Sequence, residues 1–242
     1  MTQRFKRVYI NGPQMLQKQI GACLENQEKM FIVTANPEIL MEAEREQRVA
    51  DILEDRRVTI VPDGISVIKA MRSMGYEVQE RITGVDLSTY LLQALDTMKG
   101  SLFLYGAKQE VLDALLQVLR NRYPHVCVLG AHNGYTGDYR QIFQEMIEKK
   151  PDVALIALGV PRQELCIHEF YDQFEKGIFM GVGGSLDVLS GAKKRAPKLW
   201  IRCNLEWLYR ILKEPKRIKR FYRNNVAFMK KVRRERREGD QR

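Results

Sequence analysis

Short apolar runs alternate with longer stretches of helical period along most of the chain. The apolar runs are rich in β-branched residues and predict strands at 30–34, 58–61, 102–105, 126–129, 153–158 and 177–182. Between them, apolar residues recur at three- and four-residue spacing and predict helices at 36–54, 64–75, 86–99, 108–122, 138–149 and 161–175. Strands that alternate with helices form βαβ units, so we expect an α/β fold with a mostly parallel sheet and helices on both faces.

The pattern changes in the last fifth of the chain. Apolar residues lie at helical spacing over 201–212, Pro215 interrupts them, and a second helical pattern covers 218–226. The last ten residues are strongly charged, and we expect them to be frayed. We therefore divide the chain into a catalytic-type α/β domain at 1–191 and a basic amphipathic helical segment at 192–242, called the appendage below.

Charge follows the same division. Residues 193–242 hold 19 Lys and Arg against 5 Asp and Glu, a balance of +14, whereas the residues before them carry a balance of −4. This asymmetry indicates an anionic partner for the appendage, which is a phospholipid surface, a nucleic acid or a phosphorylated substrate.

Cysteine usage and the absence of targeting signals point to a compartment. The four cysteines form no CxxC pair and lie outside metal-ligand spacing with any histidine, which favours a reduced, cytosolic environment. The N-terminus lacks the apolar region of a signal peptide, and no apolar run approaches the ~18 residues that span a bilayer. We expect any membrane attachment to be peripheral.

The ends of the predicted strands carry the candidate chemistry, because ligands of a parallel α/β sheet bind where strands end and helices begin. Gly, Pro or small polar residues follow all six strands, at 34–37, 62–64, 106–108, 130–135, 159–164 and 183–187. Ordinary turns use the same residue types. Six such ends in one sheet nevertheless favour a ligand-binding rim.

Missing motifs exclude several functions. No GxGxxG follows a strand, which argues against a dinucleotide-binding oxidoreductase, and no GxxxxGK[ST] occurs, which excludes a P-loop NTPase. Neither GxSxG nor HExxH occurs. No D-x-D pair occurs either, although many sugar-nucleotide enzymes use one to hold a divalent cation on the diphosphate. We expect no metal and no cofactor. A nucleotide-sugar diphosphate would then be stabilised by helix N-termini and arginines.

Seven segments carry a specific resemblance. They are VTANPEILMEA, VPDGISVI, ERITGVDL, YGAK, LGVPRQE, GVGGSLDVLSG and the appendage segment KRAPKLWIRCNLEWLYRILKEPKRIKRF. In this order they resemble the WecG/TagA/CpsF glycosyltransferase family, over roughly residues 8–225. The resemblance implies a Rossmann-like core and an inverting, metal-independent transfer from a UDP-sugar to an undecaprenyl-diphosphate-linked sugar. The family's best-known activity adds N-acetylmannosamine to lipid-linked N-acetylglucosamine in wall teichoic acid, common antigen or capsule synthesis.

Two residues are matched to the chemistry of the transfer. Inversion by a single displacement needs a carboxylate that takes the proton of the acceptor hydroxyl, and Asp63 of the PDG motif matches the family's proposed base. The alternative for Asp63 is a helix cap. Arg81 matches a family arginine near the reacting sugar, and its alternative is an ordinary surface arginine.

The donor pocket is matched to residues after four strands. Thr34, Asn36 and Gln163 match the family's donor-sugar pocket, although Asn36 also suits a helix cap, Gln163 suits an exposed first turn, and Ala35 replaces a proline common in relatives. For the nucleotide we name Tyr135, Gly183, Gly184 and Asp187. Tyr135 would stack on uracil and Asp187 would accept a hydrogen bond, with core or cap roles as the alternatives.

The appendage is assigned two roles. Its basic residues, interleaved with Trp and Phe, suit an anionic leaflet, which places the protein peripherally on the inner face of the plasma membrane. In relatives this segment is thought to fold over the active site, so Arg210, Arg217 and Arg220 are expected to reach the diphosphate. A core without its appendage would expose an apolar face, which makes a homo-oligomer a further expectation.

Two alternatives stay open at this stage. The same chemistry with UDP-N-acetylmannosaminuronic acid or UDP-glucose as donor would serve capsule or exopolysaccharide synthesis. A nucleic-acid-binding module on a Rossmann-like body is a more remote alternative, because basic residues among aromatic ones also suit nucleic acids.

Overall fold

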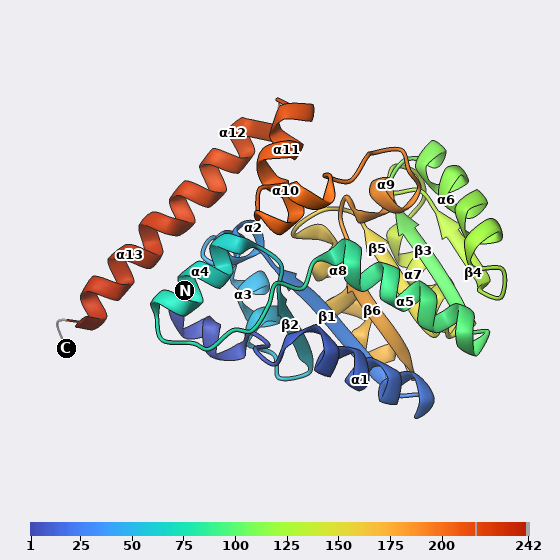
Figure 1. The fold of residues 1–242 in the computed structure, drawn as a ribbon. Coiled ribbons are helices and arrows are strands. Elements are labelled where there is room, and N and C mark those ends of the chain that lie inside the picture. The colour runs from blue at the N-terminus through green and yellow to red at the C-terminus, as the bar shows by residue number, and fades with distance from the viewer. Residues whose placement is uncertain (216, 241–242) are drawn as a thin grey trace.

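The structure is a computed structural model that describes residues 1–215 and 217–240, with the side chains of 217, 220, 239 and 240 outside the description. Six strands form one sheet in the order β2-β1-β6-β5-β3-β4, as Figure 1 shows. The strands are β1 (Lys29–Ala35), β2 (Val58–Pro62), β3 (Ser101–Gly106), β4 (Cys127–His132), β5 (Val153–Ala157) and β6 (Gly177–Gly181). Every neighbouring pair is parallel, so all strands end at the same edge of the sheet.

Helices cover both faces of this sheet. One face carries α1 (Gly12–Glu25), α5 (Gly84–Met98), α6 (Gln109–Arg122) and the short α9 (Ser185–Leu189). The other carries η1 (Thr2–Arg7), α2 (Pro37–Glu42), α3 (Gln47–Glu54), α4 (Ile65–Ser73), α7 (Tyr139–Lys149), α8 (Arg162–Phe170) and η2 (Tyr171–Gln173). The predicted α/β class, with its parallel sheet and helices on both faces, is confirmed.

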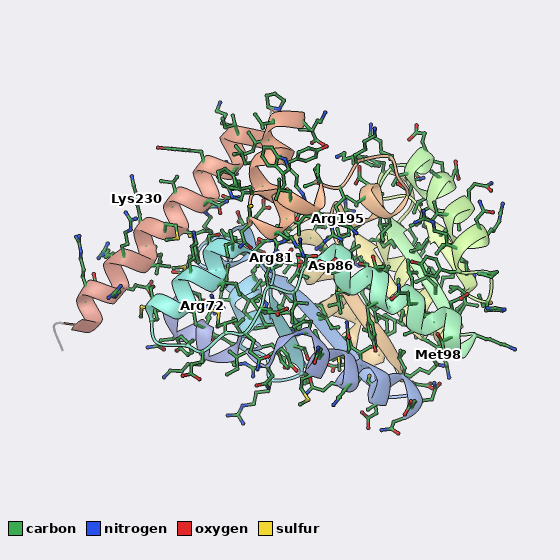
Figure 2. All side chains as sticks on the ribbon, viewed as in Figure 1. Arg72, Arg81, Asp86, Met98, Arg195 and Lys230 are labelled. Atoms are coloured by element: carbon green, nitrogen blue, oxygen red, sulfur yellow. The ribbon has the colours of Figure 1, made fainter. Side chains whose placement is uncertain are left out.

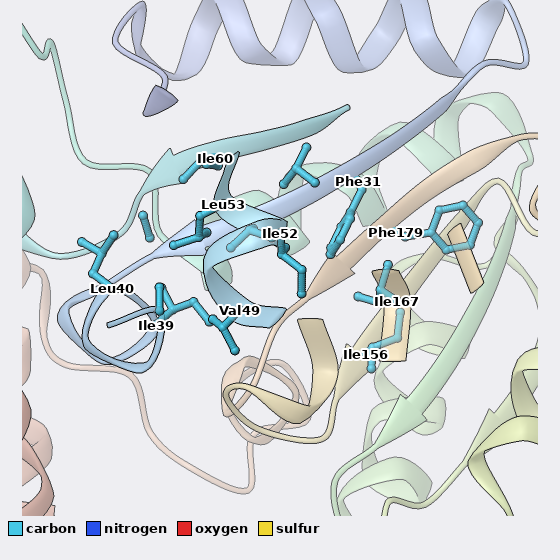
Figure 3. Packing of buried hydrophobic residues seen from close by; sticks show 14 of the residues in the cluster. Phe31, Ile39, Leu40, Val49, Ile52, Leu53, Ile60, Ile156, Ile167 and Phe179 are labelled. Atoms are coloured by element: carbon cyan, nitrogen blue, oxygen red, sulfur yellow. The ribbon is translucent and has the colours of Figure 1, made fainter. Parts of the chain in front are cut away.

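Alternation along the strands divides the core into two layers. Phe31 of β1 packs with the α3 face, as Figure 3 shows, and the next residue, Ile32, packs with the α1 face. In β6, Phe179 and Met180 divide in the same way. Successive side chains of a strand point to opposite faces, so a sheet covered on both sides needs a continuous apolar run. That requirement explains why such runs located the five buried strands; β4, at one edge of the sheet, has no buried residue.

The helical patterns predicted at 36–54 and 201–212 needed correction, because each is divided; the second falls in α10 (Lys198–Arg202) and α11 (Glu206–Lys213), with a break at 203–205. The predicted helix 36–54 is two helices, α2 and α3, separated by a turn at 43–46. At the turn, Glu44 is ion-paired with Arg4 and with Lys231 of the appendage, so tertiary contacts override the local helical period. α1 was not predicted, although its buried Leu16, Ile20 and Leu24 lie at helical spacing.

The appendage consists of α10 (Lys198–Arg202), α11 (Glu206–Lys213), α12 (Arg217–Phe221), the π-helical turn η3 (Tyr222–Val226) and α13 (Ala227–Asp240). Figure 1 shows α13 as a long red helix along one side of the molecule. Its Phe228 is fully buried, 6.4 Å between ring centroids from Phe5, and Ser66 of α4 donates to Asn225 at 3.1 Å. The expectation that the last ten residues are frayed is wrong up to Asp240, because α13 continues to that residue and Glu235 accepts from the backbone N–H of Thr2 at 2.7 Å. The boundary between residues 191 and 192 stays a prediction.

Membrane-spanning segments were searched for among the described helices. None of them has both the length and the apolar character that crossing a bilayer requires.

Candidate active site

Asp63 lies at the carboxyl edge of the sheet, directly after β2. Its backbone N–H donates to the carbonyl of Ala35 at the end of β1, 3.0 Å away. α4 begins two residues later with Gly64 as its N-cap, and no side chain caps that helix. The carboxylate of Asp63 therefore does not cap α4, the helix that follows it in the sequence.

The surroundings of Asp63 favour the protonated carboxyl. Burial raises its pKa most strongly, the charges of Arg210 and Arg81 oppose this, and the negative charge of Glu206 adds to the rise. The backbone N–H of Gly84 also hydrogen-bonds the carboxylate and lowers the pKa. The net result is a pKa raised to about 7. A carboxyl with such a pKa binds a proton far more readily near neutral pH than an exposed aspartate does.

Arg81 and Arg210 meet on one buried carboxylate. Glu206, the first residue of α11, is 4% exposed, and its Oε2 accepts from Arg81 Nη2 at 3.0 Å. Its other oxygen, Oε1, accepts from Arg210 Nη2 at 2.5 Å. Arg81 is thus engaged in the interior rather than exposed on the surface. The structure thus brings Arg81 and Arg210, which were predicted, and Glu206, which was not, next to Asp63.

A second ion pair lies beside this cluster. Arg195 makes a bidentate contact with Asp86, both N–O distances being 2.7 Å, and Figure 2 shows these two side chains next to Arg81. Burial would raise the pKa of Asp86, but hydrogen bonds from Arg195 and Thr83 and the charge of Arg81 outweigh it and lower the pKa. The Nε of Arg195 is buried and has no hydrogen-bond partner in the described part of the chain.

Thr34 and Asn36 end β1 beside Asp63. Thr34 is buried, and its methyl group approaches Gly84 at the start of α5. Asn36 is the N-cap of α2, and its Oδ1 accepts from the backbone N–H of Glu38 at 2.9 Å and of Ile39 at 3.1 Å. The cap role expected for Asn36 is therefore confirmed, and its side-chain NH₂ is left for other contacts.

Gln163 is 1% exposed, so it is not the exposed first-turn residue that was its alternative. Its Oε1 accepts from two backbone N–H groups, those of Gly159 after β5 and Gly183 after β6, each at 3.1 Å. Its Nε2 donates to Glu164 at 2.8 Å. A Cβ on Gly181 would lie 2.6 Å from that Nε2, which explains the glycine. Gln163 thus fixes two loops of the rim to each other.

Glu164 was not identified from the sequence. Its side chain is 1% exposed, and burial raises its pKa to about 7 although Gln163 donates to it. Oε2 is buried without a hydrogen-bond partner among the described residues. Nothing in the PRQE motif distinguishes this glutamate from an exposed one in the first turn of a helix.

The residues proposed for the nucleotide are more dispersed. Tyr135 is 76% exposed in the loop after β4, an edge strand. β2, which leads to Asp63, is the opposite edge, roughly 24 Å away at about 4.8 Å per strand. Gly183 and Gly184 lie in the turn before α9, and Asp187 pairs with Lys193 at 3.2 Å. The structure does not bring Tyr135 to the other site residues.

The appendage arginines have different outcomes. Arg210 reaches the cluster at Asp63, as described above. Arg217 and Arg220 lie on α12, and their side chains are outside the described residues. Their predicted contact with a diphosphate therefore stays a prediction.

A cavity of about 230 Å³ opens beside Arg81, between α1 and the start of α5. Four polar residues, Gln17, Glu80, Arg81 and Asp86, and four apolar residues, Pro13, Leu16, Ile82 and Leu87, line it. Across residues 1–215 and 217–240, no three His, Cys, Asp or Glu side chains are grouped to hold a metal ion.

Comparison with known proteins adds an independent line of evidence. A sequence model of the glycosyl transferase WecG/TagA/CpsF family matches residues 6–242. Three similar proteins are each named N-acetylglucosaminyldiphosphoundecaprenol N-acetyl-beta-D-mannosaminyltransferase. The protein of Bacillus spizizenii is 39% identical over 81% of this chain and 76% of its own, that of Bacillus subtilis 39% over 78% and 73%, and that of Staphylococcus aureus strain MW2 38% over 84% and 79%.

Proposed function

The chain belongs to the WecG/TagA/CpsF family of glycosyl transferases, and on that premise we propose that it transfers N-acetylmannosamine from UDP-N-acetylmannosamine to undecaprenyl-diphosphate-linked N-acetylglucosamine. The proposed acceptor and transferred sugar are those in the names of the similar proteins. The observation that carries the proposal is the position of Asp63 at the strand edge, facing Arg81 and Arg210.

Asp63 is the general base of the proposed mechanism. Its carboxylate takes the proton of the acceptor hydroxyl while that oxygen attacks the anomeric carbon of the donor sugar. The bond from this carbon to the β-phosphate oxygen breaks, and UDP leaves with the electron pair. A single displacement of this kind inverts the anomeric configuration. A base with a pKa of about 7 is half ionised near neutral pH and binds the transferred proton well.

The arginines supply the positive charge that the leaving diphosphate needs. Arg81 and Arg210 face Asp63 from the core and from the appendage, and Arg195, which is paired with Asp86, also lies near Asp63. Guanidinium groups bind phosphate oxygens in bidentate fashion, which suits a diphosphate without a metal ion. Arg217 and Arg220 are proposed to join them when the donor binds. Metal independence is part of the proposal and is tested with a chelator below.

The cavity beside Arg81 is proposed to hold the acceptor sugar. Its volume of about 230 Å³ suits one hexosamine ring rather than a disaccharide. Its carboxylates and its amide suit sugar hydroxyls, and its apolar residues suit the C–H face of the ring. From this cavity the acceptor hydroxyl would reach Asp63 past Arg81.

The donor is placed along the strand edge. Thr34, Asn36 and Gln163 are proposed to contact its sugar, and Gly183, Gly184, Asp187 and Tyr135 its nucleotide. Thr34 is close to Asp63 in the sheet, whereas Tyr135 requires a donor that extends away from the base. Asp187 would have to exchange its contact with Lys193 for the nucleotide.

Membrane contact is proposed through the appendage. Leu199, Leu212, Ile218 and Tyr222 are each more than half exposed there, among many basic residues. Exposed apolar side chains beside lysine and arginine suit a peripheral position on an anionic leaflet. This would place the protein on the inner face of the plasma membrane, where a polyprenyl-diphosphate acceptor is anchored. A homo-oligomer stays a prediction.

A donor panel tests the proposal. Purified protein is incubated with a short-chain polyprenyl-diphosphate N-acetylglucosamine and, in turn, UDP-N-acetylmannosamine, UDP-N-acetylmannosaminuronic acid and UDP-glucose. With the first donor we expect UDP release and a product heavier by one N-acetylhexosamine. The rate should be the same in buffer with EDTA as in buffer with magnesium. Turnover with another donor alone would move the protein to a different branch of the family. Salt-dependent binding to single- or double-stranded nucleic acid without any turnover would favour the remote alternative.

A further inference from the structure

Glu206 has an unusual position for a glutamate of a basic, partly exposed segment. It is 4% exposed, and each of its carboxylate oxygens accepts from a different arginine. One arginine, Arg81, belongs to the core, and the other, Arg210, lies one turn further along α11. We propose that Glu206 is a positioning residue of the transferase, which holds these two guanidinium groups beside Asp63 and keeps them from pairing with it. This inference rests on the proposed function.

The geometry separates Glu206 from an ordinary helical ion pair. A glutamate and an arginine four residues apart pair on the surface of many helices and contribute little when exposed. Here the carboxylate is buried and shared with a residue 125 positions away in the chain. Removing a buried carboxylate leaves two cations without their partner, which is costly. The contact between Glu206 and Arg81 also holds the start of α11 against the segment that carries Arg81.

The charges around Asp63 show what Glu206 prevents. Asp63 faces Arg81 from the segment before α5, Arg195 from the segment before α10, and Arg210 and Glu206 from α11. Arg195 is already paired with Asp86. Without Glu206, Asp63 would be the remaining carboxylate for both Arg81 and Arg210.

A direct ion pair would make Asp63 a poor base. A guanidinium group in contact with a carboxylate lowers its pKa and occupies its lone pairs. Glu206 has the opposite effect, because its negative charge raises the pKa of Asp63. Within the described residues, the ion pairs closer than 4.0 Å include both arginines with Glu206 and none with Asp63. The arginines thus stay close enough for the diphosphate while the base keeps its proton affinity.

The experiment is the pH profile of kcat/KM for UDP release in the wild type, Glu206→Gln and Glu214→Gln. Glu214 is a matched control, since it also lies in the appendage and pairs with a basic residue, Lys193, at 3.2 Å. In Glu206→Gln we expect the acid limb to move to lower pH by about one unit or more, with a fall of about tenfold in the rate at high pH. Glu214→Gln should keep the wild-type midpoint.

Two further variants keep the outcome decisive. Glu206→Asp keeps the charge but is one methylene too short to span both arginines, so we expect the rate to fall about tenfold and the midpoint to move down less than in Glu206→Gln. It carries the test if Glu206→Gln does not fold. If Asp63→Asn is inactive and Glu206→Gln has the wild-type pH profile, this inference is overturned while the proposed function stands. If Glu206→Gln does not fold, a wild-type rate in Glu206→Asp has the same meaning. An active Asp63→Asn would overturn the proposed function and this inference with it.

Discussion

The side-chain amide of Gln163 donates to the carboxylate of its chain neighbour Glu164 at 2.8 Å, and both side chains are almost completely buried. Through this contact a buried carboxylate fixes the orientation of an amide whose oxygen accepts from two strand-end loops. The rim of the site is therefore supported from below by side chains, in addition to the sheet itself.

Replacing Gln163 by Ala should loosen the rim. The backbone N–H groups of Gly159 and Gly183 would lose their shared acceptor, and a buried donor without a partner costs about 1–3 kcal/mol. We expect a loss of that size in the free energy of unfolding, measured by urea denaturation, and a raised KM for the donor. Gln144→Ala, at an exposed position of α7, is the control and should change neither. Unchanged stability of Gln163→Ala would contradict the role given to this amide.

Glu164→Gln should make the protein more stable above neutral pH. Burial raises the pKa of Glu164 to about 7, so the folded protein binds this proton more tightly than the unfolded chain does. Stability from this group is present below the unfolded pKa near 4.5 and is lost as pH rises toward 7. The glutamine never ionises and avoids the loss, which is about 3 kcal/mol at most.

The measurement for Glu164→Gln is the melting temperature as a function of pH. The variant should melt higher than the wild type at about pH 8 and similarly at about pH 4. A constant difference between the two proteins at all pH values would show that the carboxyl is not the cause.

Much of the fold could be predicted from the sequence because each buried strand is a continuous apolar run. Helix boundaries were less accessible, since the turn at 43–46 depends on Glu44 meeting Lys231 from the far end of the chain. The same limit applies to the site. Asp63 and Arg81 stand in motifs, but Glu206 looks like any acidic residue of an amphipathic helix until tertiary packing buries it. The depth of Glu164 is likewise invisible in a linear pattern.

Filling the cavity beside Arg81 should block the acceptor without affecting the donor. Gln17 lines this cavity, and tryptophan at that position would occupy much of its volume of about 230 Å³. For Gln17→Trp we expect the KM of the lipid-linked acceptor to rise about tenfold or more, with UDP binding unchanged in calorimetry. Lys18→Trp, at an exposed position one residue on, should behave as wild type. A normal acceptor KM in Gln17→Trp would place the acceptor elsewhere.

The exposed apolar residues of the appendage should govern vesicle binding. Leu212 and Ile218 are 62% and 57% exposed, and each inserted side chain contributes about 0.8 kcal/mol per buried methylene. A Leu212→Ser, Ile218→Ser double variant should bind phosphatidylglycerol vesicles about tenfold more weakly in a sedimentation assay, with its melting temperature unchanged. Met98→Ser, at a partly exposed position at the end of α5, is the control. Equal binding by the double variant would leave the basic residues alone as the membrane contact.

The central claim is that Asp63 takes the proton of the acceptor hydroxyl, and the pH dependence of UDP release in wild type and Asp63→Asn tests it most directly. Because the base must be ionised, kcat/KM of the wild type should rise with pH through a midpoint near the pKa of about 7. Asp63→Asn keeps the shape of the side chain but cannot accept the proton, so its kcat/KM should fall by about 10²–10⁴. A near-normal rate in Asp63→Asn, with the wild-type pH midpoint, would contradict the account.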